Sequence, residues 1–447
     1  MEERFRILNW LSRKELQSEV KIFLKMSHHQ KHIYVYANWN EFSDPCLLGL
    51  LNVTITRGKE VFYFEYDKEW LKSAPAQILD PDLGYYSGPQ FLSDGKSNFG
   101  LFLDSSPDRW GRLLMKRREA LRARKEERPI NTLYESDYLL GVFDGHRMGA
   151  LRFKLSPGGE FLDNDRIHAS PPFTKLRDLE YASLKIEEER DLDNPEYLKW
   201  LRLLIVPGSS LGGARPKSSV VDPANNLWIA KFPSKMDHFD VGAWEMLVHE
   251  LAQRVGIRVP ESRIEKFSGR YHTYLSKRFD RENGKRIHFA SALTMLGYTD
   301  GTGHSDGAGY LEIAEFLMRF GANVREDLEE LWKRIVFNIC VSNTDDHLRN
   351  HGFILTKEGW ILSPAYDMNP VEDAVGLSLN ISEDDNSLDL DLAREVAEYF
   401  RIDDRKSEQI ISQITSTVKG WRIIANHIGI RKTEQELMSG AFRQVDI

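Results

Sequence analysis

The stretch from residue 335 to residue 370 constrains the fold of this chain more than any other part of its sequence. It reads IVFNICVSNTDDHLRNHGFILTKEGWILSPAYDMNP. An apolar helix is expected to run into a polar loop at 343–350, and two short strands are expected at 352–355 and 360–362. The pair Tyr366-Asp367 follows. Because a hairpin turns the chain back on itself, the polar residues before and after it should lie on one side of a cleft.

Three side chains of this stretch have the types and the spacing that phosphoryl transfer requires. Protein kinases carry a D-x-x-x-x-N loop and a further Asp past the next hairpin, which Asp345, Asn350 and Asp367 match. Asp345 would accept the proton of the attacking hydroxyl, while Asn350 and Asp367 would hold Mg²⁺, which prefers hard oxygen ligands. Asp346 does not fit, because His351 stands five residues after it. The alternative is that these residues only cap a helix and shape a turn.

A loop rich in small residues lies upstream, at 206–217, and reads VPGSSLGGARPK. Small residues let backbone N–H groups approach phosphate oxygens, although no G-x-x-x-x-G-K-[ST] motif occurs in the chain. Lys231 lies in a predicted strand at 227–232, and kinases deliver an ammonium group to the phosphates from such a strand. A buried lysine needs a partner, for which Glu245 on the next helix is a candidate. The alternatives are an ordinary flexible loop and a surface lysine on an edge strand.

The remaining sequence predicts a β-rich first half and a helical second half. Apolar and polar residues alternate over 33–66, with a hairpin at Arg57-Gly58. A helix is expected from a cap at 106–108 to about Lys125, and its basic second half is interpreted as a solvated face rather than a nucleic-acid site, because glutamates interleave it. Further helices are expected at 176–189, 389–401, 407–428 and 433–443.

The expected fold is therefore α+β: a bilobal, protein-kinase-like fold with a β-rich N-terminal part and an all-α C-terminal lobe. The expected segments are a helical extension at 1–32, a β-rich domain at 33–200, a nucleotide-binding small lobe at 201–285 and a helical catalytic lobe at 286–447.

Composition limits the classes of function. A chain of 447 residues can form two or three domains. Its net charge of −8 argues against general binding of nucleic acids or membrane surfaces, since proteins that bind polyanions are usually basic. Two cysteines cannot form a disulfide framework, and no apolar run approaches the roughly 20 residues that span a bilayer. A cytoplasmic protein is expected.

Several motifs together resemble one known family. SSLGGARPK, WIAKFPS, LSKRFDR, NTDDHLRNHGFIL and LSPAYDMNP occur in the order and approximate spacing of the HipA family of bacterial serine/threonine kinases. Upstream, the segment from Leu103 to Gly111 and the motif FDGHRMGALRF resemble the N-terminal domain of that family. The resemblance covers about residues 33–445, and five motifs in order are specific where any one of them is not.

The resemblance implies a role for each matching residue. Asp345 would be the catalytic base, with Asn350 and Asp367 on Mg²⁺ and Lys231 on the phosphates of ATP. Glu245 and His347 would support them. The implied nucleotide contacts are Gly212, Gly213, Ala214, Arg215, Pro216 and Lys217 in the loop, Tyr366 at the border, and Lys277, Arg278 and Phe279 at the adenine through the hinge backbone.

The resemblance also implies regulation and partners. Members of the family autophosphorylate the serine of the Gly-rich loop, here Ser210 with Ser209 as second candidate, and the added charge would eject the loop. A small helix-turn-helix antitoxin that binds operator DNA is the implied partner, and an aminoacyl-tRNA synthetase is a possible protein substrate.

Two other classes of function remain open. One is a pseudokinase-like regulator that binds ATP without transferring phosphate. The other is a metal-dependent phosphohydrolase that uses Asp345, Asp346, His347 and His351 around a metal ion; it would leave Lys231 and the Gly-rich loop without a role.

Overall fold

The computed structural model describes residues 30–39, 42–73, 77–164, 170–188, 195–204, 213, 215–267 and 269–445. The helix predicted at 1–26 lies outside the described residues. Strand β1 begins at Gln30, so the last three residues of the predicted 1–32 extension belong to a strand, because they pair with Asn52–Thr54 of the next strand.

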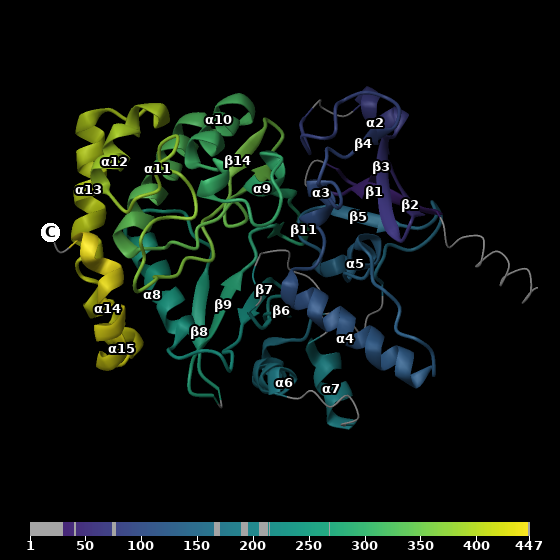
Figure 1. The fold of residues 1–447 in the computed structure, drawn as a ribbon, viewed down its shortest axis with the longest axis horizontal. Coiled ribbons are helices and arrows are strands. Elements are labelled where there is room, and N and C mark those ends of the chain that lie inside the picture. The colour runs from purple at the N-terminus through teal and green to yellow at the C-terminus, as the bar shows by residue number, and fades with distance from the viewer. Residues whose placement is uncertain are drawn as a thin grey trace, which may run out of the picture.

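An antiparallel five-stranded sheet forms one end of the molecule, in the order β4-β3-β2-β1-β5 (Figure 1). Its strands are β1 (Gln30–Ala37), β2 (Cys46–Thr56), β3 (Lys59–Tyr66), β4 (Gln90–Phe91) and β5 (Leu151–Lys154). Alternate side chains of β1, such as Ile33 and Val35, are fully buried. Arg57 and Gly58 both have positive φ, at 52° and 77°, which is the geometry of a tight hairpin turn. The predicted strands and hairpin are confirmed.

Helices surround this sheet and extend from it toward the centre of the molecule. They are α2 (Lys68–Ser73), α3 (Gly100–Leu103), α4 (Arg109–Lys125), α5 (Glu135–Leu140), α6 (Leu176–Glu188) and α7 (Pro195–Leu204). Helix α4 begins as predicted, because the carboxylate of Asp108 accepts a hydrogen bond from the backbone N–H of Gly111. Helix α7 was not predicted. Together with α6 it packs against the second sheet through a separate apolar cluster that includes Leu179 and Leu201.

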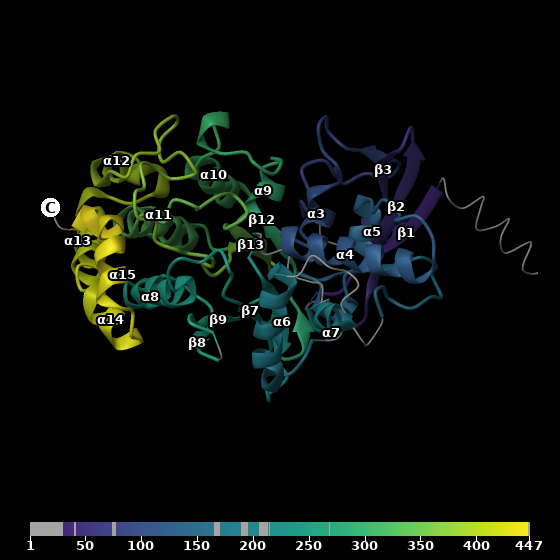
Figure 2. The same ribbon diagram turned by 60° about the horizontal axis from the view of Figure 1, so that its bottom comes forward.

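The second sheet lies in the middle of the chain and has the order β6-β7-β9-β8. Its strands are β6 (Lys217–Val221), β7 (Leu227–Lys231), β8 (Ser262–Glu265) and β9 (Thr273–Lys277), and α8 (Val241–Arg254) connects β7 to β8. Lys217 pairs with Lys231 across β6 and β7. Figure 2 shows this sheet between the N-terminal part and the helices of the C-terminal part.

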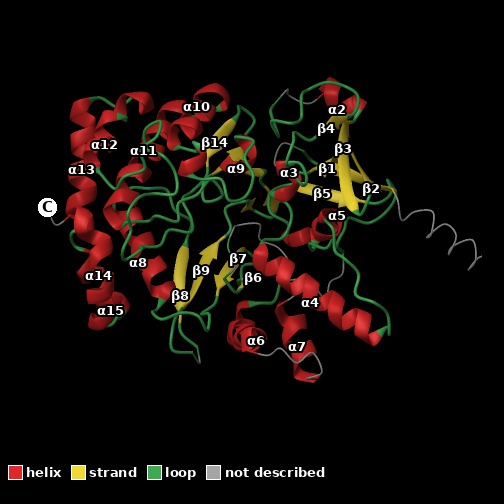
Figure 3. Cartoon of the chain, viewed as in Figure 1, coloured by secondary structure: helices red, strands yellow, loops and turns green. Residues whose placement is uncertain are grey.

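The C-terminal part is predominantly helical, as Figure 3 shows by colour. Its helices are α9 (Ala292–Met295), α10 (Tyr310–Phe320), α11 (Val324–Val341), α12 (Leu390–Glu395), α13 (Asp404–Val418), α14 (Trp421–Ile428) and α15 (Lys432–Leu437). The mixed α+β fold is thus confirmed. One detail differs from an all-α lobe, because this part also contains a small three-stranded sheet. Its strands are the two predicted ones, β13 (Gly352–Leu355) and β14 (Trp360–Leu362), and β12 (Phe289–Ser291), which pairs with β13. A short ribbon of β10 (Arg281–Glu282) and β11 (Lys285–Arg286) precedes it.

The single helix predicted at 407–428 is wrong, because the structure has two. Helix α13 ends at Val418 and α14 begins at Trp421, after Gly420. Glycine is the poorest helix former after proline, so the interruption falls where the helix is weakest. The aromatic ring of Trp421 then stacks on Phe442, with ring centroids 4.3 Å apart.

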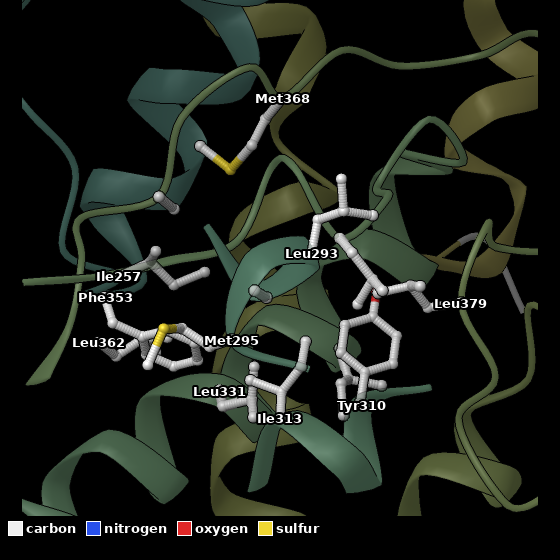
Figure 4. Packing of buried hydrophobic residues seen from close by; sticks show 14 of the residues in the cluster. Ile257, Leu293, Met295, Tyr310, Ile313, Leu331, Phe353, Leu362, Met368 and Leu379 are labelled. Carbon is white, nitrogen blue, oxygen red and sulfur yellow. The ribbon is translucent and has the colours of Figure 1, made fainter. Parts of the chain in front are cut away.

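Helix α11 is the centre of the C-terminal core. Apolar side chains of α11 such as Leu331 and Ile335 have no exposed surface. Figure 4 shows Leu331 beside Ile313 and Tyr310 of α10, with Met295 and Phe353 nearby. A helix buried on nearly all sides holds the residues at its C-terminal end in a fixed place. Of the helices within the described ranges, none is long and apolar enough to cross a membrane.

Candidate active site

A pocket of about 500 Å³ opens between the second sheet and the segment that follows β14. This volume includes space that is open to solvent. It is lined by Met148, Lys217, Ile229, Lys231, Glu245, Tyr274, Ser276, Lys277, Arg278, Phe279, Asp280, Tyr366 and Asp367. Three separate parts of the chain therefore meet at one cavity: the N-terminal part, the second sheet with α8, and the C-terminal part.

Lys231 lies at the centre of the charged side of the pocket. Its Nζ is 2.6 Å from Oε1 of Glu245 and 2.5 Å from Oδ1 of Asp367. Lys231 comes from strand β7, Glu245 from α8 and Asp367 from the segment after β14. One ammonium group thus joins the sheet, the helix and the C-terminal part.

The pKa shifts of these groups follow from burial and from their mutual charges. Burial alone would raise the pKa of Asp367, but Lys231 and Lys217 outweigh it and lower that pKa below its ordinary value. For Glu245, burial outweighs Lys231, so its pKa is raised. Burial would lower the pKa of Lys231, but Asp367 and Glu245 raise it, so Lys231 is a cation at neutral pH.

The polar loop begins where α11 ends. Ser342 caps the helix with a positive φ of 50°, which turns the chain sharply. Asp345 is exposed, and the protein around it still raises the pKa of its carboxyl group above the ordinary value; the charges of Asp367 and Asp346 act in the same direction. A carboxylate with a raised pKa is a better proton acceptor than a free one.

Asp346 has a structural role next to this loop. Its Oδ2 accepts hydrogen bonds from the hydroxyl of Tyr310, from Nδ2 of Asn338 at 2.7 Å and from the ring of His351 at 2.8 Å. These contacts anchor the loop to the core. Asp346 and His351 are therefore hydrogen-bonded to each other in the interior. Within the described part of the chain, no group of three or more His, Cys, Asp or Glu side chains is arranged to hold a metal ion. The cluster required by the phosphohydrolase alternative is not assembled.

Asn350 has the feature expected of a cation ligand. Its Nδ2 donates to the carbonyl of Asp345 at 2.9 Å, while its Oδ1 is buried and has no hydrogen-bond partner. An unsatisfied buried oxygen is costly, so a ligand for it is to be expected. An amide oxygen and the carboxylate of Asp367 are the hard donors that suit Mg²⁺, and the residues present fit that ion.

Tyr366 and Asp367 are fixed by the same loop. The hydroxyl of Tyr366 donates to the carbonyl of Arg349 at 2.7 Å, and its ring lies 5.6 Å from that of Phe279. Asp367 has a φ of 58°, which is uncommon outside glycine and costs on the order of 1–3 kcal/mol. This backbone conformation and the contact with Lys231 occur at the same residue, so the structure holds the Asp367 carboxylate against the pocket.

Lys277, Arg278 and Phe279, the residues of the predicted hinge, all line the pocket, but their side chains differ in direction. The guanidinium group of Arg278 is fully buried and contacts Asp280 and the backbone carbonyls of His146 and Arg147 in the N-terminal part. Arg278 therefore cannot offer its side chain to a ligand, and its backbone N–H already donates to the carbonyl of Leu227 at 2.9 Å. Lys277 instead forms an ion pair with Glu261, 3.2 Å away.

The loop residues are described only in part. Ser209, Ser210, Gly212 and Ala214 lie outside the described residues. Of the remainder, Lys217 lines the pocket, whereas Gly213, Arg215 and Pro216 do not. Arg215 forms a two-pronged ion pair with Asp237, at 2.8 and 2.6 Å. His347 is half-buried, and its backbone N–H donates to the carbonyl of Asp345 at 3.1 Å.

Sequence reasoning missed several residues at this site: Ile229, Tyr274 and Ser276 line the pocket, and three more lie in motifs named above. Met148 and Asp280 line the pocket, and Asp108 pairs with Lys217 at 3.1 Å. Met148 lies in FDGHRMGALRF, Asp280 in LSKRFDR and Asp108 in the segment 103–111. These motifs stand out in the sequence, but nothing local in them indicates that they meet the nucleotide-binding strands.

Comparison with known proteins identifies the C-terminal half. Residues 209–421 match the HipA-like C-terminal domain. A putative kinase of Haemophilus influenzae is 26% identical over 179 residues, which are 36% of this chain and 52% of that protein. The putative kinase Y4mE of Sinorhizobium fredii is 26% identical over 147 residues, 31% of this chain and 33% of that protein. The chain thus matches about half the length of the first relative and a third of the second.

A solved structure extends the likeness of fold to nearly the whole chain. The HipA protein of Shewanella oneidensis MR-1, in complex with HipB and its operator DNA, has a TM-score of 0.63 and 18% identity, over 92% of this chain and 95% of that one. At such identity the likeness is one of fold. The matched domain at 209–421 contains Lys231, the loop at 343–350 and Asp367. Residues 209–421 of the chain therefore match a HipA-like C-terminal domain, and the fold of nearly the whole chain is similar to that of a HipA protein.

Proposed function

We propose that this chain is an ATP- and Mg²⁺-dependent serine/threonine protein kinase of the HipA toxin type. The observation that carries the proposal is the position of Lys231, 2.6 Å from Glu245 and 2.5 Å from Asp367 on one wall of the pocket. Kinases hold their phosphate-binding lysine between a helix carboxylate and the metal-binding aspartate in the same way. The family of the C-terminal domain supports the same activity.

Each residue then has a task in the transfer. Lys231 binds the phosphates of ATP, and Glu245 keeps its ammonium group in the pocket. Asp345, exposed and with a raised pKa, accepts the proton of the substrate hydroxyl. Mg²⁺, held by Asp367 and by Oδ1 of Asn350, would neutralise charge on the phosphates. The backbone of residues 277–279 and the rings of Tyr366 and Phe279 border the base of the nucleotide.

The proposed phosphate acceptor in the chain itself is Ser210, with Ser209 as second candidate. A phosphate adds about −1.5 to −2 charges beside a pocket that already must hold a triphosphate. The modified loop would compete with ATP or leave the pocket, and activity would stop. A cytosolic protein, such as an aminoacyl-tRNA synthetase, is the proposed acceptor in trans.

A small helix-turn-helix antitoxin is the proposed partner, and DNA would be reached only through it. The support is the Shewanella HipA structure, which contains HipB and operator DNA. The net charge of −8 is consistent with a chain that does not itself bind DNA.

The test is incubation with labelled ATP and Mg²⁺, followed by mass-spectrometric mapping of the modified residue. Wild type is expected to label Ser210, and Asp345→Asn is expected to lose labelling while retaining ATP binding and its melting temperature. Asp384→Asn, an exposed aspartate in the segment after Asp367, is the matched control.

Two results would contradict the proposal. Undiminished labelling of Asp345→Asn would remove Asp345 from the reaction. ATP binding by wild type without any transfer, to itself or to a protein, would support the regulatory alternative instead.

A further inference from the structure

A short turn of the N-terminal part contacts both the second sheet and the C-terminal part, through Lys217 and Ser291. It occupies residues 104–108, from Asp104 to Asp108, and connects α3 to α4. The side chains of Asp104 and Asp108 are only 4% and 6% exposed. Aspartates are almost never this buried unless they are paired, so the partners of these two carboxylates indicate what the turn does.

Asp108 holds the first residue of the nucleotide-binding sheet. Its Oδ2 is 3.1 Å from Nζ of Lys217, and the indole N–H of Trp110 donates to the carbonyl of Lys217 at 3.0 Å. Both the side chain and the backbone of Lys217 are therefore fixed from the N-terminal part. Lys217 lines the pocket opposite Lys231 on the adjacent strand, and its charge reaches Asp367.

Asp104 contacts two residues of the C-terminal part, Ser291 and Arg349. Its two oxygens accept hydrogen bonds from the backbone N–H and the hydroxyl of Ser291, at 2.7 and 2.8 Å, and it lies 3.7 Å from the guanidinium group of Arg349. Ser291 is the N-cap of α9. The residues after it donate backbone hydrogen bonds to the loop at 343–351, from Ala292 to His351 and from Leu293 to Leu348.

Asp108 thus contacts the second sheet, and Asp104 contacts the residues beside the loop that carries Asp345. A turn of fixed length spaces them, so the lysine of β6 and the loop that carries Asp345 are held at a set separation by a segment outside the kinase-like domain. Misplacement by about 1 Å of groups in a reacting pair can cost on the order of a hundredfold in rate.

We propose that Asp104 and Asp108 are positioning residues for phosphoryl transfer, through which the N-terminal part aligns the nucleotide with the catalytic loop. Asp108 acts through Lys217 on nucleotide binding, and Asp104 acts through Ser291 and Arg349 on the loop. The proposal rests on the proposed kinase activity and deepens it.

Two substitutions separate these effects. Asp108→Asn removes the charge but keeps an oxygen that can cap α4, since asparagine is as good an N-cap as aspartate. Asp108→Asn is expected to weaken ATP binding about tenfold and to raise the KM for ATP by the same factor, with little change in kcat. Asp104→Asn is expected to lower kcat by at least about tenfold, with ATP affinity unchanged within about twofold.

The experiment measures ATP affinity by calorimetry, kcat and KM by transfer of labelled phosphate, and thermal unfolding, on the full chain. Asp94→Asn, an exposed aspartate of the same N-terminal part, is the matched control. In a Lys217→Met background, Asp108→Asn should cause no further loss of ATP affinity. Ser291→Ala replaces Asp104→Asn if that variant does not fold, and the same fall in kcat is expected.

The outcomes are distinct. Changes in KM and kcat by one common factor, parallel to a loss of thermal stability, would mean that the turn is only structural and would overturn the inference. A further loss of ATP affinity in the Lys217→Met background would do the same for Asp108. If wild type transfers no phosphate, the proposed function fails, while the calorimetric comparison still tests Asp108.

Discussion

Buried polar side chains in this protein differ in whether they have partners. Asp346 has three donors and Lys231 has two carboxylates, and both sit at the proposed site. His288 is an exception, and burial alone accounts for the shift of its pKa. It is 1% exposed, neither ring nitrogen has a hydrogen-bond partner, and the ring stacks on Trp39 with centroids 4.9 Å apart. Such a group is stable only when neutral.

The pH dependence of stability should reveal His288. Burial lowers its pKa to about 3, whereas the unfolded chain has a pKa near 6.5. The folded state therefore has its full stability above pH 6.5 and loses it as the pH falls, because only the unfolded chain takes up the proton. Between pH 7.5 and 5 this one group should remove about 2 kcal/mol from the free energy of unfolding.

Replacement by a ring that cannot titrate tests this. Between pH 7.5 and pH 5, the free energy of unfolding of His288→Phe should decrease by about 2 kcal/mol less than the free energy of unfolding of wild type. His427→Phe, at an exposed position, controls for the loss of one histidine. Identical pH profiles for wild type and His288→Phe in urea titrations would show that the ring takes up a proton as readily in the folded state as in the unfolded chain.

At the scale of the element, α8 brings Glu245 to Lys231 only because its first turn lies very close to the chain before β9. Asp240 caps α8 and also accepts hydrogen bonds from the backbone N–H and the ring of His272, at 2.9 and 2.6 Å. Gly242 permits this approach, since a Cβ there would lie 2.4 Å from the carbonyl oxygen of His272.

Gly242→Ala has two opposing effects on stability: a higher helix propensity, and a clash with the carbonyl oxygen of His272. Alanine would gain up to about 1 kcal/mol in a helix, but a contact of that kind with backbone forces a shift that costs about 1–3 kcal/mol. We expect a net loss of stability in urea unfolding and weaker ATP binding, because Glu245 lies one turn further along the helix. Gly158→Ala, with open space around its Cβ, should be harmless. Equal stabilities of the two variants would show that α8 can move without penalty.

At the scale of the whole molecule, a buried charge cluster joins the N-terminal part to the hinge. Asp280 accepts hydrogen bonds from Arg278, from Arg281 and from the backbone N–H of Gly149, at distances between 2.6 and 2.8 Å. Burial would raise the pKa of Asp280, but the two arginines lower it to about 2. The cluster therefore stays ionised at neutral pH.

Asp280→Asn keeps the shape of the side chain and removes its charge. Two buried guanidinium groups then lack a counter-charge, and breaking a buried pair in this way costs about 3–5 kcal/mol. We expect that loss in urea unfolding at pH 7. In wild type, the free energy of unfolding should fall by about 2 kcal/mol as the pH falls from about 4 toward 2, since the folded-state pKa of Asp280 is depressed. A stability within about 0.5 kcal/mol of the surface control Asp94→Asn would refute the role of the cluster.

Much of the fold and the spacing of the candidate site residues could be predicted from the sequence. Alternation, caps and turn residues predicted the hairpin at Arg57-Gly58, the start of α4 and the strand pair after the polar loop, because those signals act over a few residues. The spacing of Asp345, Asn350 and Asp367 depends on one hairpin, so it too could be found locally. Helix α7 and the break at Gly420 were missed, because packing decided them.

The sequence alone determined which side chains are candidates for the proposed chemistry, since residue type and local spacing are properties of the chain. Only the tertiary structure decided that Lys231 meets Asp367, 136 residues away, and that the turn at 104–108 contacts both Lys217 and Arg349. Contacts between distant segments depend on how buried surfaces fit together, and no short-range pattern encodes that fit.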